Sequence, residues 1–333
     1  MSLVPDLAFD DLLKREINIS ANQISQGSTS HNYIRTLLNN KCEHDSNFPW
    51  LTDGDFLSGS YARGTKIYPL DDIDVMVVID GTGLLAIQDG QVLPATVRGG
   101  NKLGSPMQNY LSSNGLLSSQ VVLQLFQNAL KQSHPESKVS KDGQAINVQL
   151  KASGIGIDVV PCFHVIPNNG GQDVYYIPVG YGRDDWMITN PKIDQSISDY
   201  LHERHNRKLK SIIKLLKYWN REGNNERLRS YHLETMAWYI FHNHPSAIDN
   251  YADGVKYFFQ SADQYLGQPC SDITKLGGPV DSYLSIEDRI ASRIRIQQIC
   301  QLLRPPSLPL IASVSEQREL RSWQAIFNNK LDI

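Results

Sequence analysis

The chain has 333 residues, 41% of them hydrophobic and 20% charged, which is typical of a globular protein of about two domains and excludes a disordered or collagen-like chain. The formal charge of −3 argues against a protein whose main task is to coat nucleic acid. The four cysteines form no CxxC pair, and no apolar run approaches the roughly 18 residues of a membrane span, so we expect a soluble, cytoplasmic protein with reduced thiols and no zinc knuckle.

The first half of the chain predicts helices around a mixed sheet. Apolar positions over residues 7–38 indicate helical pieces interrupted near Gly27 and Ser28. Runs rich in Val and Ile predict strands at 55–57, 72–80, 145–150 and 155–163, and an apolar stripe predicts a helix over 116–132. Residues 81–115, rich in Gly, Ser and Asn, form an apparent insert in which Asp89-Gly90 indicates a tight hairpin.

The second half of the chain predicts mainly helices. Candidate helices cover residues 191–223, 230–244, 251–266, 285–303 and 315–329. We therefore predict an α+β protein with two parts. Residues 1–165 would form a sheet-containing core with an N-terminal helical segment, and residues 166–333 a mostly helical lobe.

Two carboxylates lie on the strand predicted over residues 72–80, shortly after a Gly-Ser pair. Successive strand side chains alternate between faces, so Asp72 and Asp74 point the same way while Ile73 and its apolar neighbours point into the core. Such paired carboxylates favour a hard cation such as Mg²⁺. Gly59 permits close backbone approach, and Ser60 offers donors to phosphate oxygens. Taken singly, these features are better explained by an ordinary turn and a solvated strand entrance.

A third carboxylate strengthens the metal-site interpretation. Asp158 lies in the apolar run GIGIDVVPCF, on the face opposite Ile157 and Val159. A charge within such a strand is costly unless it is paired, at an edge or bound to a metal. Two metal ions held by three carboxylates can activate a hydroxyl and stabilise a leaving pyrophosphate.

The string GSYARGTKIYPLDDIDVMVV, followed by the distal Asp158, resembles the polymerase-β-type nucleotidyltransferase superfamily. Within it, the sequence is most similar to the cyclic GMP-AMP synthase and CD-NTase enzymes. KLLKYWN and LRSYHLETMAWYIF in the helical half resemble the spine helix and the Ser-Tyr segment of that family. The resemblance implies a nucleotidyltransferase core with a mixed sheet, and a helical lobe that closes the nucleotide pocket.

The resemblance also implies the roles of individual residues. Asp72 and Asp74 would bind two Mg²⁺ ions, with Mn²⁺ as an alternative, and Asp158 would hold the ion nearer the acceptor hydroxyl. Gly59 and Ser60 belong to the nucleotide-binding set. Its remaining implied members are two triphosphate contacts and one residue that stacks on a nucleobase: Lys217, Ser230 and Tyr231.

A basic concentration agrees with a bound polyphosphate. Residues 204–229 contain nine Lys or Arg and only two acidic residues, Glu222 and Glu226. For Lys217 alone, a solvated helix face is an equally good interpretation, and Lys214 is an alternative triphosphate ligand.

The expected activity is Mg²⁺-dependent joining of NTPs, ATP among them and GTP or another NTP as a further candidate. The product would be a cyclic di- or trinucleotide second messenger that a downstream effector senses, as in the bacterial antiphage (CBASS) signalling of this family. One alternative is a template-independent transferase that makes linear oligonucleotides or modifies RNA ends. The slightly acidic charge disfavours such a nucleic-acid polymer substrate. The other is a non-catalytic nucleotide-binding sensor, which the intact set of three aspartates disfavours.

Overall fold

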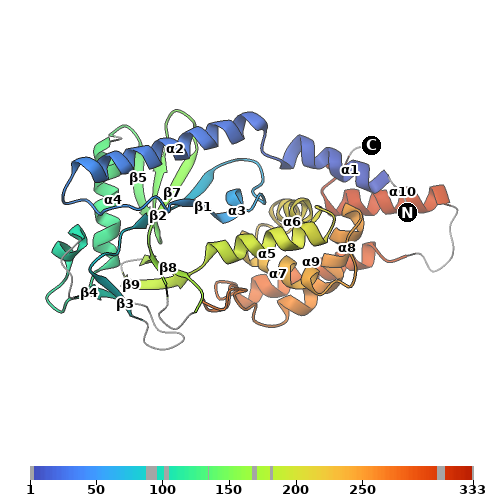
Figure 1. Ribbon diagram of the computed structural model, residues 1–333. Helices are drawn as coiled ribbons and strands as arrows, with labels where there is room; N and C mark the ends of the chain where they lie inside the picture. Colours follow the sequence, from blue (N-terminus) through green and yellow to red (C-terminus); the bar gives the residue numbers. More distant parts are fainter. Residues whose placement is uncertain are drawn as a thin grey trace. The chain divides into compact units, whose positions relative to one another are not determined.

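The computed structural model describes residues 4–87, 96–100, 105–133, 135–166, 171–180, 183–305 and 312–331. Their fold is α+β with a mixed sheet, as predicted (Figure 1). The chain divides into two compact units. We call Met1–Ile19, Arg63–Pro69 and Ile193–Ile333 the helical unit, and Ser20–Ala62 with Leu70–Lys192 the sheet unit. The units thus alternate along the chain, whereas the sequence predicted a single boundary after residue 165.

Seven of the described strands of the sheet unit form one mixed sheet. These strands are β1 (Phe56–Ser58), β2 (Asp72–Ile79), β5 (Lys138–Asp142), β6 (Ala145–Gln149), β7 (Gly156–Val165), β8 (Val174–Gly180) and β9 (Arg183–Thr189). The order is β1-β2-β7-β6-β5, with β8 pairing β7 and β9 pairing β8. The central pair β2 and β7 is parallel, and the other pairs are antiparallel. Because β8 and β9 continue this sheet, the sheet unit extends well beyond residue 165.

The first long helix of the sheet unit corrects a prediction. The N-terminal helical pieces are α1 (Val4–Leu12), the π-helical turn η1 (Leu13–Ile17) and α2 (Ala21–His44), so the break precedes Ser20. The hydroxyl of Ser20 and the side chain of Gln23 form a capping box that starts α2. The predicted interruption near Gly27 and Ser28 is wrong, because both residues lie inside α2. A Cβ at Gly27 would lie 2.9 Å from the Ile73 Cδ1, so glycine allows α2 to approach β2.

Four short elements and one longer helix complete the described part of the sheet unit. They are the turn helix α3 (Gly59–Ala62), the hairpin strands β3 (Leu84–Ile87) and β4 (Thr96–Gly99), the 3₁₀ helix η2 (Pro106–Tyr110) and α4 (Ser119–Ser133). β3 and β4 pair antiparallel, but Ile87 lies opposite Thr96, so residues 88–95 separate the strands and the pair is not the tight hairpin that the sequence predicted. The turn predicted at Asp89-Gly90 lies outside the described residues.

The two faces of the central strands have different roles. Ile73 and its alternate neighbours are buried on the face that α2 contacts. On the opposite face, further along the same strands, Met76 and Cys162 belong to a separate apolar cluster with Tyr175. Asp72, Asp74 and Asp158 share this second face by alternation but precede the apolar cluster along β2 and β7. The sheet therefore places the carboxylates at one end of a strand face whose other end is packed.

The helical unit has its own hydrophobic core. Its helices besides α1 and η1 are α5 (Pro191–Arg204), α6 (Leu209–Gly223), α7 (Ser230–His242), α8 (Tyr251–Leu266), α9 (Ile286–Leu302) and α10 (Ala312–Ile326). The helix predicted over 191–223 is two helices, because Asn206 and Arg207 adopt positive φ angles of 51° and 59°. The ring of Phe9 lies 5.2 Å from that of Trp323, which joins α1 to α10. Across the described residues, every helix is too short or too polar to span a bilayer.

Candidate active site

Strands β2 and β7 bring the three predicted carboxylates together. In the parallel register Asp74 is directly opposite Asp158, and Asp72 is opposite Gly156. Asp72, Asp74 and Asp158 are all half-buried, and each offers a carboxylate oxygen within 4.8 Å of those of the other two. The three carboxylates therefore lie on the same face of the sheet, as the side-chain alternation in the sequence predicted.

Gly59 contacts one of these carboxylates. It begins α3, immediately after Ser58 on β1, and Ser58 pairs with Asp74 on β2. Its φ angle is +68°, and a Cβ at this position would lie only 1.7 Å from the Asp74 Oδ2. Only glycine fits both the backbone conformation and the contact. Ser60, the next residue, is half-buried in α3.

Asn147 on β6 orients the third carboxylate. Its side-chain amide donates a hydrogen bond of 2.8 Å to the Asp158 Oδ1, and the two residues are opposite each other in the β6–β7 register. Sequence reasoning missed this residue. The available signal was the alternation in AINVQ, where Ile146 and Val148 are buried and Asn147 faces the other side.

The donor set suits a divalent cation. Three converging carboxylate oxygens are hard ligands, and Mg²⁺ and Mn²⁺ prefer oxygen ligands and keep positions for water and substrate phosphate. Half-burial leaves the group reachable while reducing the screening of its charge. The residues present therefore fit a catalytic metal of this class.

Lys217 lies in the helical unit within a buried ionic cluster. Its ammonium is 2.6 Å from the Glu234 Oε1 and donates a hydrogen bond of 3.2 Å to the Thr65 carbonyl oxygen. The residue is 5% exposed. The ammonium thus has two protein partners, which sequence reasoning did not foresee; whether it also contacts a triphosphate stays a prediction.

Other basic residues of the 204–229 stretch also have protein partners. Lys214 donates to the Asn18 Oδ1 at 3.0 Å, and Arg221 donates to the Tyr68 carbonyl at 2.6 Å. Lys210 pairs with Asp199 at 2.6 Å. The basic excess read from the sequence is therefore used in large part to hold neighbouring segments of the helical unit.

Ser230 and Tyr231 begin α7. Ser230 is exposed as the first residue of the helix, and Tyr231 is half-buried. The Tyr231 hydroxyl is 3.1 Å from one carboxylate oxygen each of Asp194 and Asp272. The guanidinium carbon of Arg63 lies 5.7 Å from the centre of the Tyr231 ring. The ring is therefore held in a defined orientation.

Asp194 is a buried acid whose ionisation should oppose folding. Burial raises the pKa of Asp194 from 3.8 to about 6, because the charged form loses hydration at 7% exposure. Because the pKa is raised in the folded state, the contribution of Asp194 to the free energy of unfolding is fully present below pH 3.8. It is lost as pH rises through about 6. We expect this loss to cost about 3 kcal/mol of unfolding free energy.

Urea denaturation of the wild type and of Asp194→Asn, from pH 4 to pH 7.5, measures this contribution. The neutral asparagine still accepts the Tyr231 hydrogen bond, so the variant should gain stability relative to the wild type as pH rises. Other titrating groups are common to both proteins and cancel in the difference. Parallel stability curves would show that Asp194 is not the group responsible.

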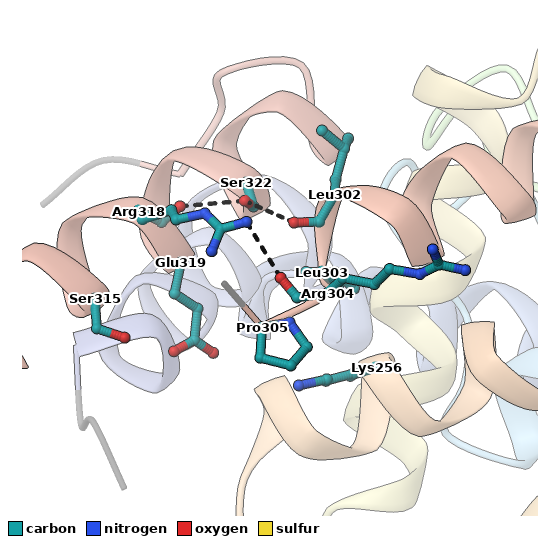
Figure 2. Close-up of a pocket in the computed structure, with 9 residues that line it drawn as sticks. All are labelled: Lys256, Leu302, Leu303, Arg304, Pro305, Ser315, Arg318, Glu319 and Ser322. Atoms are coloured by element: carbon teal, nitrogen blue, oxygen red, sulfur yellow. Dashed lines mark hydrogen bonds between the residues drawn. The ribbon is translucent and has the colours of Figure 1, made fainter. Parts of the chain in front are cut away.

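A small hollow of about 150 Å³ lies beside α8, the end of α9 and α10. Figure 2 shows the residues that line it. Two polar side chains around it form hydrogen bonds to backbone carbonyls of the protein. Arg318 donates to the Arg304 carbonyl at 3.3 Å, and the Ser322 hydroxyl is 3.1 Å from the Leu302 carbonyl. These bonds join α10 to the end of α9, so we interpret the hollow as a feature of helix packing.

Comparisons with known proteins agree with this geometry. Residues 1–92 match the family described as Second Messenger Oligonucleotide or Dinucleotide Synthetase domain (SMODS). A probable cyclic nucleotide synthase of Bacillus cereus (strain VD146) is 26% identical over 240 residues, 71% of each chain. A cyclic AMP-AMP-AMP synthase of Acinetobacter sp. (strain ATCC 27244 / 9458) is 26% identical over 224 residues, 65% of this chain and 52% of that one.

Two solved structures show the same fold. Escherichia coli MS115-1 CdnC with ATP has a TM-score of 0.65 and 15% identity, covering 98% of this chain and 99% of that chain. A CdnC:HORMA-deltaN complex from the same source gives a TM-score of 0.67 and 14% identity, covering 98% of each chain.

Proposed function

We propose that this chain is a nucleotidyltransferase of the CD-NTase family that joins NTPs into a cyclic di- or trinucleotide with release of pyrophosphate. The observation that carries the proposal is the group of three carboxylates on β2 and β7, with Gly59 packed against Asp74. ATP is the favoured substrate, since the relatives include a cyclic AMP-AMP-AMP synthase and a solved CdnC structure with ATP.

In the proposed reaction, a ribose hydroxyl of one nucleotide attacks the α-phosphorus of another. An oxygen–phosphorus bond forms to the acceptor, the bond to the pyrophosphate oxygen breaks, and the hydroxyl proton passes to water near Asp158. We propose that Asp72 and Asp74 hold two Mg²⁺ ions and that Asp158, oriented by Asn147, shares the one nearer the acceptor. Such ions, when bound, lower the pKa of the hydroxyl and neutralise charge on the leaving group.

The remaining predicted residues have proposed roles in nucleotide binding. Gly59 and Ser60 would present backbone and hydroxyl donors to phosphate oxygens. Ser230, exposed at the start of α7, would contact the triphosphate together with Lys217. The oriented ring of Tyr231 would stack on a nucleobase, an interaction that tolerates different bases.

We place the activity in the cytoplasm, where NTPs and Mg²⁺ are available. We further propose that the cyclic product is a signal sensed by a separate effector, as in antiphage defence. The support for this biological role is the match of residues 1–92 to the second-messenger synthetase family.

The product identifies the function. Incubation of the purified chain with labelled ATP, alone and with GTP, in Mg²⁺ should give a compact product that resists phosphatase. Its mass should equal a di- or trinucleotide without terminal phosphate, because closure of a bound linear intermediate is effectively unimolecular. Chromatography and mass spectrometry make the measurement.

The alternatives have distinct outcomes in the same experiment. A ladder of linear chains with phosphatase-sensitive ends would favour an oligonucleotide or RNA-end transferase. Nucleotide binding without any release of pyrophosphate, across all NTP combinations, would favour a non-catalytic sensor.

A further inference from the structure

A short segment of the chain belongs to the helical unit although its neighbours on both sides belong to the sheet unit. Arg63–Pro69 is grouped with the helices, whereas the sheet unit contains Ser20–Ala62 and resumes at Leu70. Ser60 lies three positions before Arg63, and Asp72 lies three positions after Pro69. The segment therefore connects the Gly59-Ser60 turn to the strand that bears the carboxylates.

Glu234 on α7 binds this segment at two residues. The Arg63 guanidinium donates to Glu234 through two nitrogens, at 2.9 Å to Oε2 and 3.3 Å to Oε1. The Thr65 hydroxyl donates to the Oε2 at 2.9 Å. Such a paired contact from a planar guanidinium fixes orientation as well as distance.

The three residues of this contact are buried. Glu234 and Thr65 are 0% exposed and Arg63 is 6% exposed. Although burial alone would raise it, the charges of Lys217 and Arg63 lower the pKa of Glu234 to about 2, so the carboxylate is charged at neutral pH. Loss of this anion would remove the carboxylate that bonds both buried cations, Arg63 and Lys217.

Side chains of helix α6 bind backbone carbonyl oxygens of the same segment. Lys217 donates to the Thr65 carbonyl at 3.2 Å, and Arg221 donates to the Tyr68 carbonyl at 2.6 Å. The Tyr68 N–H in turn donates to the Ile17 carbonyl at 2.8 Å. Backbone bonds thus hold the segment at Thr65 and Tyr68, and Glu234 adds side-chain bonds at Arg63 and Thr65.

We propose that Glu234 is a positioning residue for nucleotidyl transfer: by fixing Arg63 and Thr65, it sets the segment that connects Gly59-Ser60 with Asp72. This inference rests on the proposed function. In this proposal, the bonds from Glu234 to Arg63 and Thr65 determine the geometry of the catalytic turn as well as stabilising the helical unit.

Steady-state kinetics and hydrogen exchange test the proposal with Glu234→Gln. The amide keeps an acceptor for Arg63 but removes the charge, so we expect kcat to fall about 10- to 100-fold, with a smaller change in the KM for ATP. Amide exchange of peptides covering residues 59–69 should become faster. Thr65→Val removes one hydrogen bond without changing the charge, and it should reduce kcat by about 3- to 10-fold. This variant still tests the proposal if Glu234→Gln fails to fold.

Trp323→Phe is the stability control. Trp323 is buried in contact with Phe9 and Phe327, so the variant should lower the melting temperature while leaving kcat and the exchange of residues 59–69 near the wild-type values. All kinetics are measured at a temperature where each variant is folded.

The outcomes separate this inference from the proposed function. A wild type that forms no nucleotide product removes the proposed function and the inference with it. An active wild type whose Glu234→Gln and Thr65→Val variants keep full kcat and slow exchange overturns the inference alone. So does a control that loses as much kcat as Glu234→Gln for the same drop in melting temperature.

Discussion

Replacing Asp72 and Asp74 together with alanine is expected to lower product formation by at least about a thousandfold. The two carboxylates supply most of the oxygen ligands in a group whose ligand atoms lie within 4.8 Å of one another. Labelled ATP turnover in Mg²⁺, followed by chromatography, measures the effect.

The same variant should remain folded. The two side chains are half-buried and lie beside a third carboxylate, so their removal relieves like-charge repulsion when no metal is bound. We expect an unchanged or higher melting temperature without metal, and a smaller rise on adding Mg²⁺ or Mn²⁺ than the wild type gives. Near wild-type turnover by the folded double variant would refute the assignment of the carboxylates.

Gly59→Ala is expected to lower kcat by at least about a hundredfold, because the new Cβ would lie 1.7 Å from the Asp74 Oδ2 and must displace that carboxylate. Part of the effect is conformational. An alanine at a φ of +68° costs about 1–2 kcal/mol wherever it occurs.

Gly154→Ala isolates this conformational part. Gly154 has a φ of +70°, but a Cβ there would meet nothing within 4 Å. The two variants should therefore lose similar backbone stability, while only Gly59→Ala should lose most of its activity. Equal activity of the two variants in steady-state kinetics would mean that the contact between Gly59 and Asp74 is unimportant.

Much of the fold and the carboxylate group could be predicted from local patterns. The alternation of Asp72 and Asp74 with buried residues follows from strand geometry, which requires no knowledge of distant contacts. Asp158 was recognisable as a charge in an apolar strand, although its position opposite Asp74 needed the parallel pairing of β2 with β7.

Two helix predictions failed, each for a physical reason that the sequence pattern does not show. Glycine inside α2 looked like a helix break, because propensity favours that interpretation, but close packing of Gly27 against Ile73 overrides it. The helix expected over 191–223 is broken where Asn206 and Arg207 adopt positive φ, which a smooth apolar period conceals.

The sequence by itself determined the chemistry that this protein can perform: three carboxylates on strand faces, a Gly-Ser turn before them, and basic residues on a helix. Only the tertiary structure decided how those groups are held. Arg63 and Glu234 are 171 positions apart, and Asn147 reaches Asp158 from a neighbouring strand. Side-chain periodicity is fixed by the bond geometry of adjacent residues, whereas a buried ion pair between distant residues forms only where packing excludes water and brings both partners together.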